Sequence, residues 1–197
     1  DEKVGSRKKL GDVSFMRQAV EKMKAGQIWK PREHVYLQLV TYSGHNPFVL
    51  PDKLKRIHLK GSYPQKMLDY MTMANYTDHA LGILLSYLKS RPDWRETMVV
   101  IVGDHEGLAA DRADIRRSAV GRRVVPAGQY TPFIVLNSPV AMRYDGVLGQ
   151  VDMYPTILNL MHLDNYLWRG MGQSLLDKRK KAVAVGSQMN VEGDIPH

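Results

Sequence analysis

The sequence predicts an α/β protein with a mostly parallel sheet flanked by helices. Apolar, β-branched segments alternate along the chain with segments whose apolar residues recur at helical spacing. One such strand, Thr97 to Val102, runs directly into Gly103-Asp104-His105-Glu106. Open α/β sheets bind ligands at the carboxyl ends of their strands, so the sequence places a candidate site at this edge.

The N-terminal elements have clear boundaries. Residues 1–12 are polar and are predicted to form a loop, and a helix is predicted over 13–23 that ends at Gly26. Residues 35–41 are mostly apolar and are predicted to form an interior strand, which leads into a loop over 42–48.

The middle of the chain is predicted to hold one long helix, from about Pro64 to Ser90, bracketed by prolines. Asp78 lies on or beside its apolar face, where we expect it to hydrogen-bond a neighbouring loop. After the Val99 strand, residues 106–129 are rich in Gly, Ala and Arg and predict a mobile loop with one short helix.

The C-terminal part continues the alternation. A strand is predicted over 132–137, and a helix over 157–161 with Asp152 as its N-cap. Residues 183–186 predict a last short strand, and no internal repeat is present.

Bulk composition narrows the class of protein. The chain has 197 residues, enough for one domain with a substantial core. Its formal net charge of +8 favours anionic partners, namely phosphorylated or sulfated substrates, anionic lipid headgroups or nucleic acid. We expect no nucleic-acid binding, because no RNP, zinc-finger or helix-turn-helix signature is present.

The sequence contains no cysteine, which excludes disulfides and thiolate metal sites. No stretch approaches the roughly 18 apolar residues of a membrane span. The chain starts at Asp1 without the apolar core of a signal peptide. We therefore expect an excerpt of a longer protein, with any signal or membrane anchor upstream.

Asp104 and His105 are the candidate metal ligands. A carboxylate oxygen beside an imidazole nitrogen suits Mn²⁺ or Zn²⁺. Spacing alone also fits an ordinary strand-to-loop turn, so the motif needs its wider context.

Five segments, in order, resemble motifs of the sulfatase-like branch of the alkaline phosphatase superfamily. Among its members they most resemble the lipoteichoic acid synthase, or phosphoglycerol transferase, group. The segments are Ser43 to Phe48 (SGHNPF), Tyr76 to Gly82 (YTDHALG), Val102 to His105 (VGDH), Gly149 to Leu158 (GQVDMYPTIL) and Met171 to Leu176 (MGQSLL).

This resemblance implies a metal site between two halves of one catalytic domain. Asp104 and His105 would be the C-terminal contribution to a site for Mn²⁺, or for another divalent cation such as Zn²⁺, Mg²⁺ or Ca²⁺. His45 would contact the transferred phosphate as a catalytic and substrate-binding residue. The nucleophilic Thr and a further acidic ligand would lie upstream, so we expect residues 1–197 to be the C-terminal part of the domain, inactive alone.

The implied activity is transfer of a phosphoglycerol-type headgroup from a phospholipid to an acceptor through a phospho-threonine intermediate. Arg112 is a further substrate-binding candidate, since a guanidinium matches phosphate geometry, and Glu106 is expected to be solvated near the metal. Two alternatives stay open: a sulfatase or phosphodiesterase on the same scaffold, and a non-catalytic module that binds anionic ligands. The resemblance also implies a membrane protein whose catalytic domain lies outside the cytoplasm.

Overall fold

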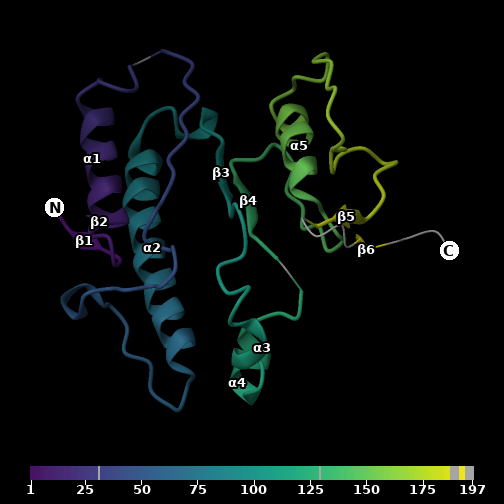
Figure 1. Ribbon diagram of the computed structural model, residues 1–197. Coiled ribbons are helices and arrows are strands. Elements are labelled where there is room, and N and C mark those ends of the chain that lie inside the picture. The colour runs from purple at the N-terminus through teal and green to yellow at the C-terminus, as the bar shows by residue number, and fades with distance from the viewer. Residues whose placement is uncertain (31, 129, 187–190, 194–197) are drawn as a thin grey trace. The chain divides into compact units, whose positions relative to one another are not determined.

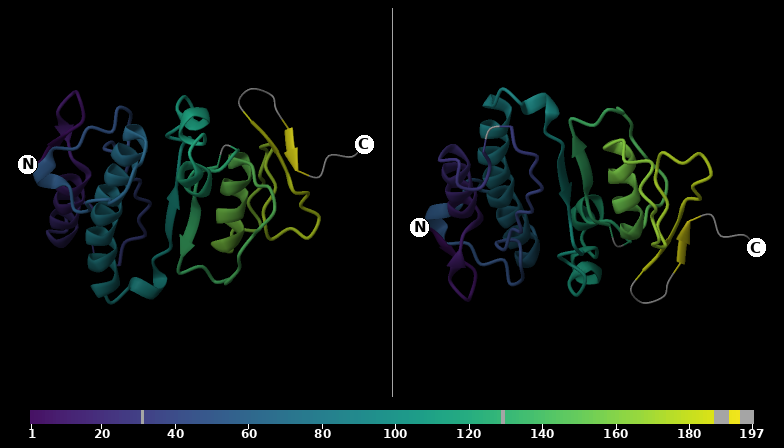
Figure 2. Two further views of the ribbon diagram at one scale, coloured as in Figure 1. Left: turned by 90° about the horizontal axis from the view of Figure 1, so that it is seen from below. Right: turned by 90° about the horizontal axis from the view of Figure 1, so that it is seen from above.

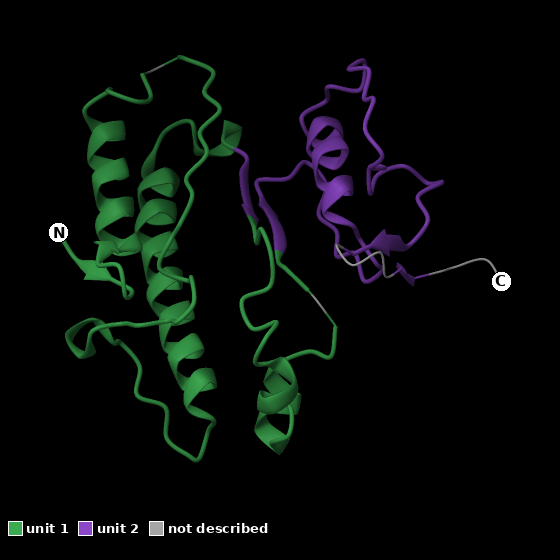
Figure 3. Ribbon diagram, viewed as in Figure 1, with its two compact units in different colours: residues 1–97, 102–132 green, residues 98–101, 133–197 purple. Residues whose placement is uncertain are grey.

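The computed structural model describes residues 1–30, 32–128, 130–186 and 191–193 (Figure 1). The chain divides into two compact units (Figure 3). The first unit holds residues 1–97 and 102–132, and the second holds residues 98–101 and 133–197. Both predicted metal ligands, and His45, belong to the first unit.

Two long helices form the centre of the first unit. Helix α1 spans Asp12–Lys24 and α2 spans Gln65–Ser90, and the two lie side by side (Figures 1 and 2). Both confirm the helices predicted from apolar spacing, because the apolar residues of each face the other. The core side chains they bury include Met16, Ala19, Val20, Met23, Met73, Ala80 and Leu84.

Gly26 ends α1 as predicted. It adopts a left-handed φ of 64°. The backbone N–H of Gly26 donates to the Met23 carbonyl at 3.0 Å, and that of Gln27 donates to the Lys22 carbonyl at 2.9 Å. This is the pattern that closes a helix on a glycine, because glycine reaches positive φ without a steric penalty.

The N-terminal residues form a hairpin rather than the predicted loop. Strand β1 (Lys3–Val4) pairs antiparallel with β2 (Lys9–Leu10). The Tyr76 hydroxyl of α2 donates to Glu2 Oε2 at 2.6 Å. Burial and this carboxylate partner together raise the pKa of Tyr76 far above its usual range. The hydrogen bond therefore ties the hairpin to α2.

The predicted interior strand at 35–41 is wrong for the described chain, in which these residues form no strand. Tyr36 is 91% exposed and Val40 is 70% exposed. A strand needs a neighbour to satisfy its backbone donors and acceptors, and no described segment pairs with this one.

The described strands form three two-stranded sheets, so the predicted mostly parallel sheet is not built by these residues alone. Strand β3 (Val99–Val102) pairs with β4 (Phe133–Leu136), both at predicted positions. The N–H of Gly103 donates to the Pro132 carbonyl at 3.1 Å, which joins the end of β3 to the start of β4 and makes the pair antiparallel. Strands β5 (Val183–Val185) and β6 (Val191–Gly193) are also antiparallel.

The remaining elements are short. Two helices, rather than one, follow the β3 edge, and the last helix begins directly after Asp152, its predicted N-cap. These three helices are α3 (Arg112–Ile115), α4 (Ala119–Val124) and α5 (Met153–Leu160). Short 3₁₀ turns lie at η1 (Asp52–Leu54), η2 (Trp94–Glu96) and η3 (Gln150–Asp152). No helix among the described residues is both long and apolar enough to cross a bilayer.

Asp152 organises the second unit. It is the N-cap residue of α5, but its buried carboxylate makes no capping bond within the helix. Instead it accepts from the N–H of Gly149 at 3.1 Å and of Gln173 at 2.8 Å, and it pairs with Lys180 Nζ at 3.1 Å. Thr156 adds a fourth link, because its hydroxyl accepts from the Leu175 N–H at 3.0 Å. These bonds join two of the recognised motifs.

We expect Gly172→Ala to destabilise the protein by about 1–3 kcal/mol, because a Cβ there would overlap the Val151 carbonyl, which is backbone and cannot move aside. The matched control is Gly82→Ala in α2, where a Cβ meets nothing within 4 Å. That change should stabilise the helix by about 0.5–1 kcal/mol. Urea unfolding of both variants measures the difference, and equal midpoints would contradict the packing described here.

Candidate metal and phosphate site

Asp104 and His105 emerge from the end of β3. Gly103 precedes them, and a Cβ on Gly103 would lie 3.0 Å from side-chain atoms of Thr131 and Pro132, so a glycine suits the close approach of the two chain segments. The side chains of Asp104 and His105 are 88% and 70% exposed. Both predicted ligands are therefore presented on the surface of the first unit.

The geometry of the two side chains fits joint coordination of one cation. His105 Nδ1 lies 3.0 Å from the Glu106 carbonyl. A ring nitrogen facing a carbonyl carries the proton, which leaves Nε2 with its lone pair for a metal. His105 Nε2 and Asp104 Oδ2 are 3.7 Å apart. Two donors that each lie roughly 2.0–2.2 Å from one ion are at most about 4.4 Å from each other, so the observed separation is short enough for both to bind the same cation.

The pair supplies only part of a coordination shell. No group of three or more His, Cys, Asp or Glu side chains suitable for a metal occurs among the described residues. Zinc takes four ligands and octahedral Mn²⁺ about six. Further donors must therefore come from water, substrate or other protein residues.

His45 lies in the loop between α1 and α2. Its Nδ1 lies 2.7 Å from the Asn46 carbonyl, and its ring stacks on Tyr42 with centroids 5.8 Å apart and planes at 7°. The imidazole is exposed. These two contacts orient the ring and leave Nε2 available to an incoming anion.

A buried carboxylate that the sequence reasoning missed holds the start of this loop. Asp12 is 1% exposed. Its Oδ1 accepts from the N–H of Tyr42 at 2.9 Å and of Ser43 at 3.0 Å. Its Oδ2 accepts from the Thr77 hydroxyl at 2.9 Å, and its own N–H donates to Ser43 Oγ. Asp12 thus positions the residues directly before His45.

The hydrogen bond predicted for Asp78 is made by its neighbour instead. Asp78 is exposed, while Thr77 reaches Asp12. Successive residues on a helix point about 100° apart, so the rotation of α2 about its axis decides that Thr77, rather than Asp78, meets Asp12 of α1.

The first turns of α2 join the His45 loop to the loop that follows Asp104 and His105. Lys66 Nζ donates to Asn46 Oδ1 at 2.6 Å and lies 3.9 Å from Asp111 Oδ2. Tyr70 packs edge-to-face on the buried ring of Phe48, with centroids 5.2 Å apart. Tyr70 also lies against Gly107, where a Cβ would be 2.9 Å from its ring. One helix end therefore holds both loops that carry predicted site residues.

Arg112 forms an ion pair with Glu106, and the two side chains are only 19% and 12% exposed. Glu106 is therefore not the solvated residue we expected. Arg112 also donates to the Ala127 carbonyl at 3.3 Å. With Arg116 and Arg117 it lines an open hollow of about 440 Å³. The substrate-binding role of Arg112 stays a prediction. Its contacts with Glu106 and Ala127 show that it joins two parts of the segment that follows β3.

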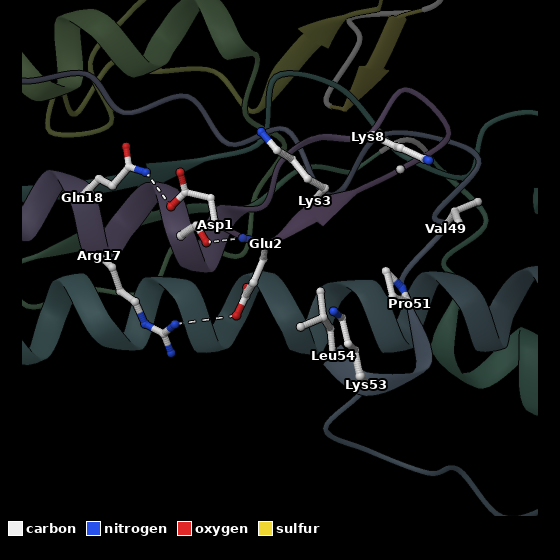
Figure 4. Close-up of a pocket in the computed structure, with 12 residues that line it drawn as sticks. Asp1, Glu2, Lys3, Lys8, Arg17, Gln18, Val49, Pro51, Lys53 and Leu54 are labelled. Carbon is white, nitrogen blue, oxygen red and sulfur yellow. Dashed lines mark hydrogen bonds and ion pairs between the residues drawn. The ribbon is translucent and has the colours of Figure 1, made fainter.

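A second hollow lies apart from these residues. It has a volume of about 830 Å³ and is lined by the N-terminal hairpin, α1 and residues 49–54 (Figure 4). Glu2 pairs with Arg17 at 3.6 Å, and Gln18 donates to Asp1 Oδ1 at 3.0 Å on its wall. None of the predicted site residues lines it.

We expect Asp12→Asn to destabilise the protein by about 2–3 kcal/mol, because an amide offers one acceptor oxygen where the carboxylate uses two, and it lacks the negative charge that strengthens all three bonds. The matched control is Asp78→Asn, at an exposed position of α2. Thermal unfolding compares the two. An Asp12→Asn midpoint equal to that of the control would refute the anchoring role of Asp12.

The sulfatase family model matches residues 8–163. The chain therefore belongs to the sulfatase family, which is part of the alkaline phosphatase superfamily. This agrees with the five motifs and with the exposed Asp-His pair.

Among individual proteins, the chain is similar to the lipoteichoic acid synthases of Staphylococcus aureus strains USA300 and NCTC 8325. Each is 29% identical over 152 residues, covering 72% of this chain and 23% of the synthase. The chain thus spans about a quarter of the length of these relatives.

A solved structure shares the fold. The crystal structure of a protein in the alkaline phosphatase superfamily from Vibrio parahaemolyticus aligns with a TM-score of 0.53 and 22% identity. The alignment covers 80% of this chain and 35% of that protein. This match confirms the predicted superfamily fold for the aligned part of the chain.

Proposed function

We propose that residues 1–197 are the C-terminal part of the catalytic domain of a metal-dependent phosphotransferase. Its reaction moves a phosphoglycerol-type headgroup from a phospholipid to an acceptor, through a threonine nucleophile outside these residues. The observation that carries the proposal is the exposed Asp104 and His105 pair, 3.7 Å apart, in a chain of the sulfatase family. The similarity to lipoteichoic acid synthases supports this substrate class.

Asp104 Oδ2 and His105 Nε2 would hold the divalent cation, with Mn²⁺ as the proposed ion. When bound, such a cation stabilises negative charge on phosphate oxygens and lowers the pKa of a hydroxyl nucleophile. The Glu106 carbonyl keeps His105 in the required tautomer.

His45 would act on the phosphate. Its Nδ1 proton is engaged by the Asn46 carbonyl, so Nε2 accepts or donates the proton at a phosphate or leaving-group oxygen. Asp12 and Lys66 position its loop, through Ser43 and Asn46 respectively. Arg112 would help to bind the phosphate of the substrate, and its ion pair with Glu106 would orient the guanidinium for this role.

The complete domain would carry the mostly parallel sheet of the superfamily. The exposed apolar residues 35–41 support this, because they have strand composition and no partner among the described residues. The intact protein would be anchored in the membrane through an upstream segment, with this domain outside the cytoplasm.

The test uses the intact protein in vesicles that contain phosphatidylglycerol, with Mn²⁺ or with EDTA. We expect diacylglycerol to form only with Mn²⁺, and an acid-stable phosphoglycerol adduct to appear on a threonine peptide in mass spectra. Rapid release of sulfate from aryl sulfates, without diacylglycerol, would identify a sulfatase instead. Metal and anion binding without turnover would identify a binding module.

A further inference from the structure

An unusual concentration of exposed apolar side chains follows α5. Most lie in the segment 161–171, and two lie on η3 and α5. Together they form what we call the aromatic loop: Val151, Tyr154, Met161, Leu163, Tyr166, Leu167, Trp168 and Met171. Leu167 is 70% exposed and Met171 is 91% exposed. All eight belong to the second unit. Clustered exposed apolar residues of this kind mark a surface that contacts a protein or a membrane.

The aromatic loop has a defined local structure. The Trp168 indole N–H donates to the Gly172 carbonyl at 3.0 Å, and its ring packs on Tyr154 with centroids 5.0 Å apart. The N–H of Tyr166 donates to the Leu163 carbonyl at 3.0 Å. These bonds hold Trp168 against α5 while Leu167, beside it in sequence, stays exposed.

The composition of the loop suits a lipid surface. Trp and Tyr prefer the boundary between headgroups and acyl chains, where an apolar ring and a polar edge are both satisfied. Arg169, Lys178 and Lys181 are exposed in the same unit. Each basic residue near an anionic leaflet contributes about 1 kcal/mol of attraction. Exposed apolar and basic side chains in one unit suit an anionic leaflet, which offers negative headgroups above an apolar layer.

We propose that the aromatic loop inserts its apolar side chains into the headgroup region of an anionic lipid leaflet. This would hold the second unit at the surface from which a lipid donor is drawn. The link to the donor rests on the proposed function, whereas membrane contact itself does not. The loop contains none of the candidate site residues Asp104, His105 and His45, so the proposal concerns access to substrate rather than the reaction.

The first experiment measures insertion directly. The sequence has no cysteine, so Leu167→Cys introduces one labelling position into this chain for the environment-sensitive dye NBD. The control is Met142→Cys, which is 51% exposed in the same unit but outside the aromatic loop. With the intact protein and vesicles of phosphatidylcholine with 30% phosphatidylglycerol, we expect a blue shift and at least twofold brighter emission at position 167 only.

Two results would overturn the proposal. If emission at position 167 is unchanged by vesicles, the loop does not insert. If it is already blue-shifted before vesicles are added, another part of the protein covers the loop.

The second experiment separates insertion from catalysis. Leu167→Gln with Met171→Gln should lower the rate on phosphatidylglycerol in vesicles about tenfold, the effect of losing roughly one buried leucine side chain. The rate on a soluble glycerophosphate ester should stay within twofold, and Met142→Gln should change neither rate. An equal loss on both substrates would overturn a membrane role. Absence of turnover on both substrates, in the unmutated protein, would instead refute the proposed function and leave the NBD result to decide insertion.

Discussion

Asp104→Ala and His105→Ala, each made in the intact protein, are expected to lower kcat/KM at least 100-fold. Each change removes one of the two donors that lie 3.7 Å apart at the end of β3. Charge stabilisation by a bound cation contributes several kcal/mol to the transition state, and each 1.4 kcal/mol corresponds to tenfold in rate. Mn²⁺ affinity, measured by isothermal titration calorimetry, should fall in parallel.

The matched control for this prediction is Asp114→Ala. Asp114 lies on α3, in the segment that follows the metal edge, and its side chain is 75% exposed beside Arg117. It should keep full activity and Mn²⁺ affinity. Because Asp104 and His105 are also exposed, all three variants should keep the unfolding midpoint of the unmutated protein when it is measured without Mn²⁺. Unchanged turnover in Asp104→Ala would remove the metal-site assignment.

Lys180→Met is expected to cost about 3–5 kcal/mol of unfolding free energy, the largest stability effect we predict. The side chains of Lys180 and Asp152 are each 6% exposed, and Lys180 Nζ lies 3.1 Å from Asp152 Oδ2. Taking a charge out of water is costly, and removing its partner leaves the remaining carboxylate buried without a counter-charge. The two backbone N–H donors, from Gly149 and Gln173, offset only part of that cost.

Two further variants isolate the buried charge as the cause. Lys178→Met changes an exposed lysine two residues away and should alter stability by less than about 0.5 kcal/mol. Asp152→Asn combined with Lys180→Met removes both charges and should recover part of the loss, because the amide can still accept a hydrogen bond. Urea unfolding measures all three. A double variant less stable than Lys180→Met by a further 2 kcal/mol would show that geometry, not charge, dominates.

Local patterns in the sequence predicted the helices well. Apolar spacing placed α1 and α2, and Gly26, Pro64 and Pro92 marked their limits. These signals act over a few residues, so they do not depend on the rest of the molecule. The motif order likewise indicated the family, which the match over residues 8–163 establishes.

Strand pairing was predicted less well, because it depends on contacts between distant segments. Strands β3 and β4 occur where expected, but they pair antiparallel, and the Val35 segment forms no strand among the described residues. The hairpin of β1 and β2 was missed, since its strands are two residues each and carry no alternating pattern.

The sequence by itself determined the two long helices and the family, and it supplied the residues of the candidate site as a prediction, because residue type and short-range spacing carry that information. Only the tertiary structure decided what supports the site. It assigned the loop anchor to Asp12 and Thr77, the bridge between loops to Lys66, and a counter-ion role to Arg112. The physical reason is that a buried polar side chain must find a partner in space, and that partner can lie 65 residues away, as it does for Asp12 and Thr77.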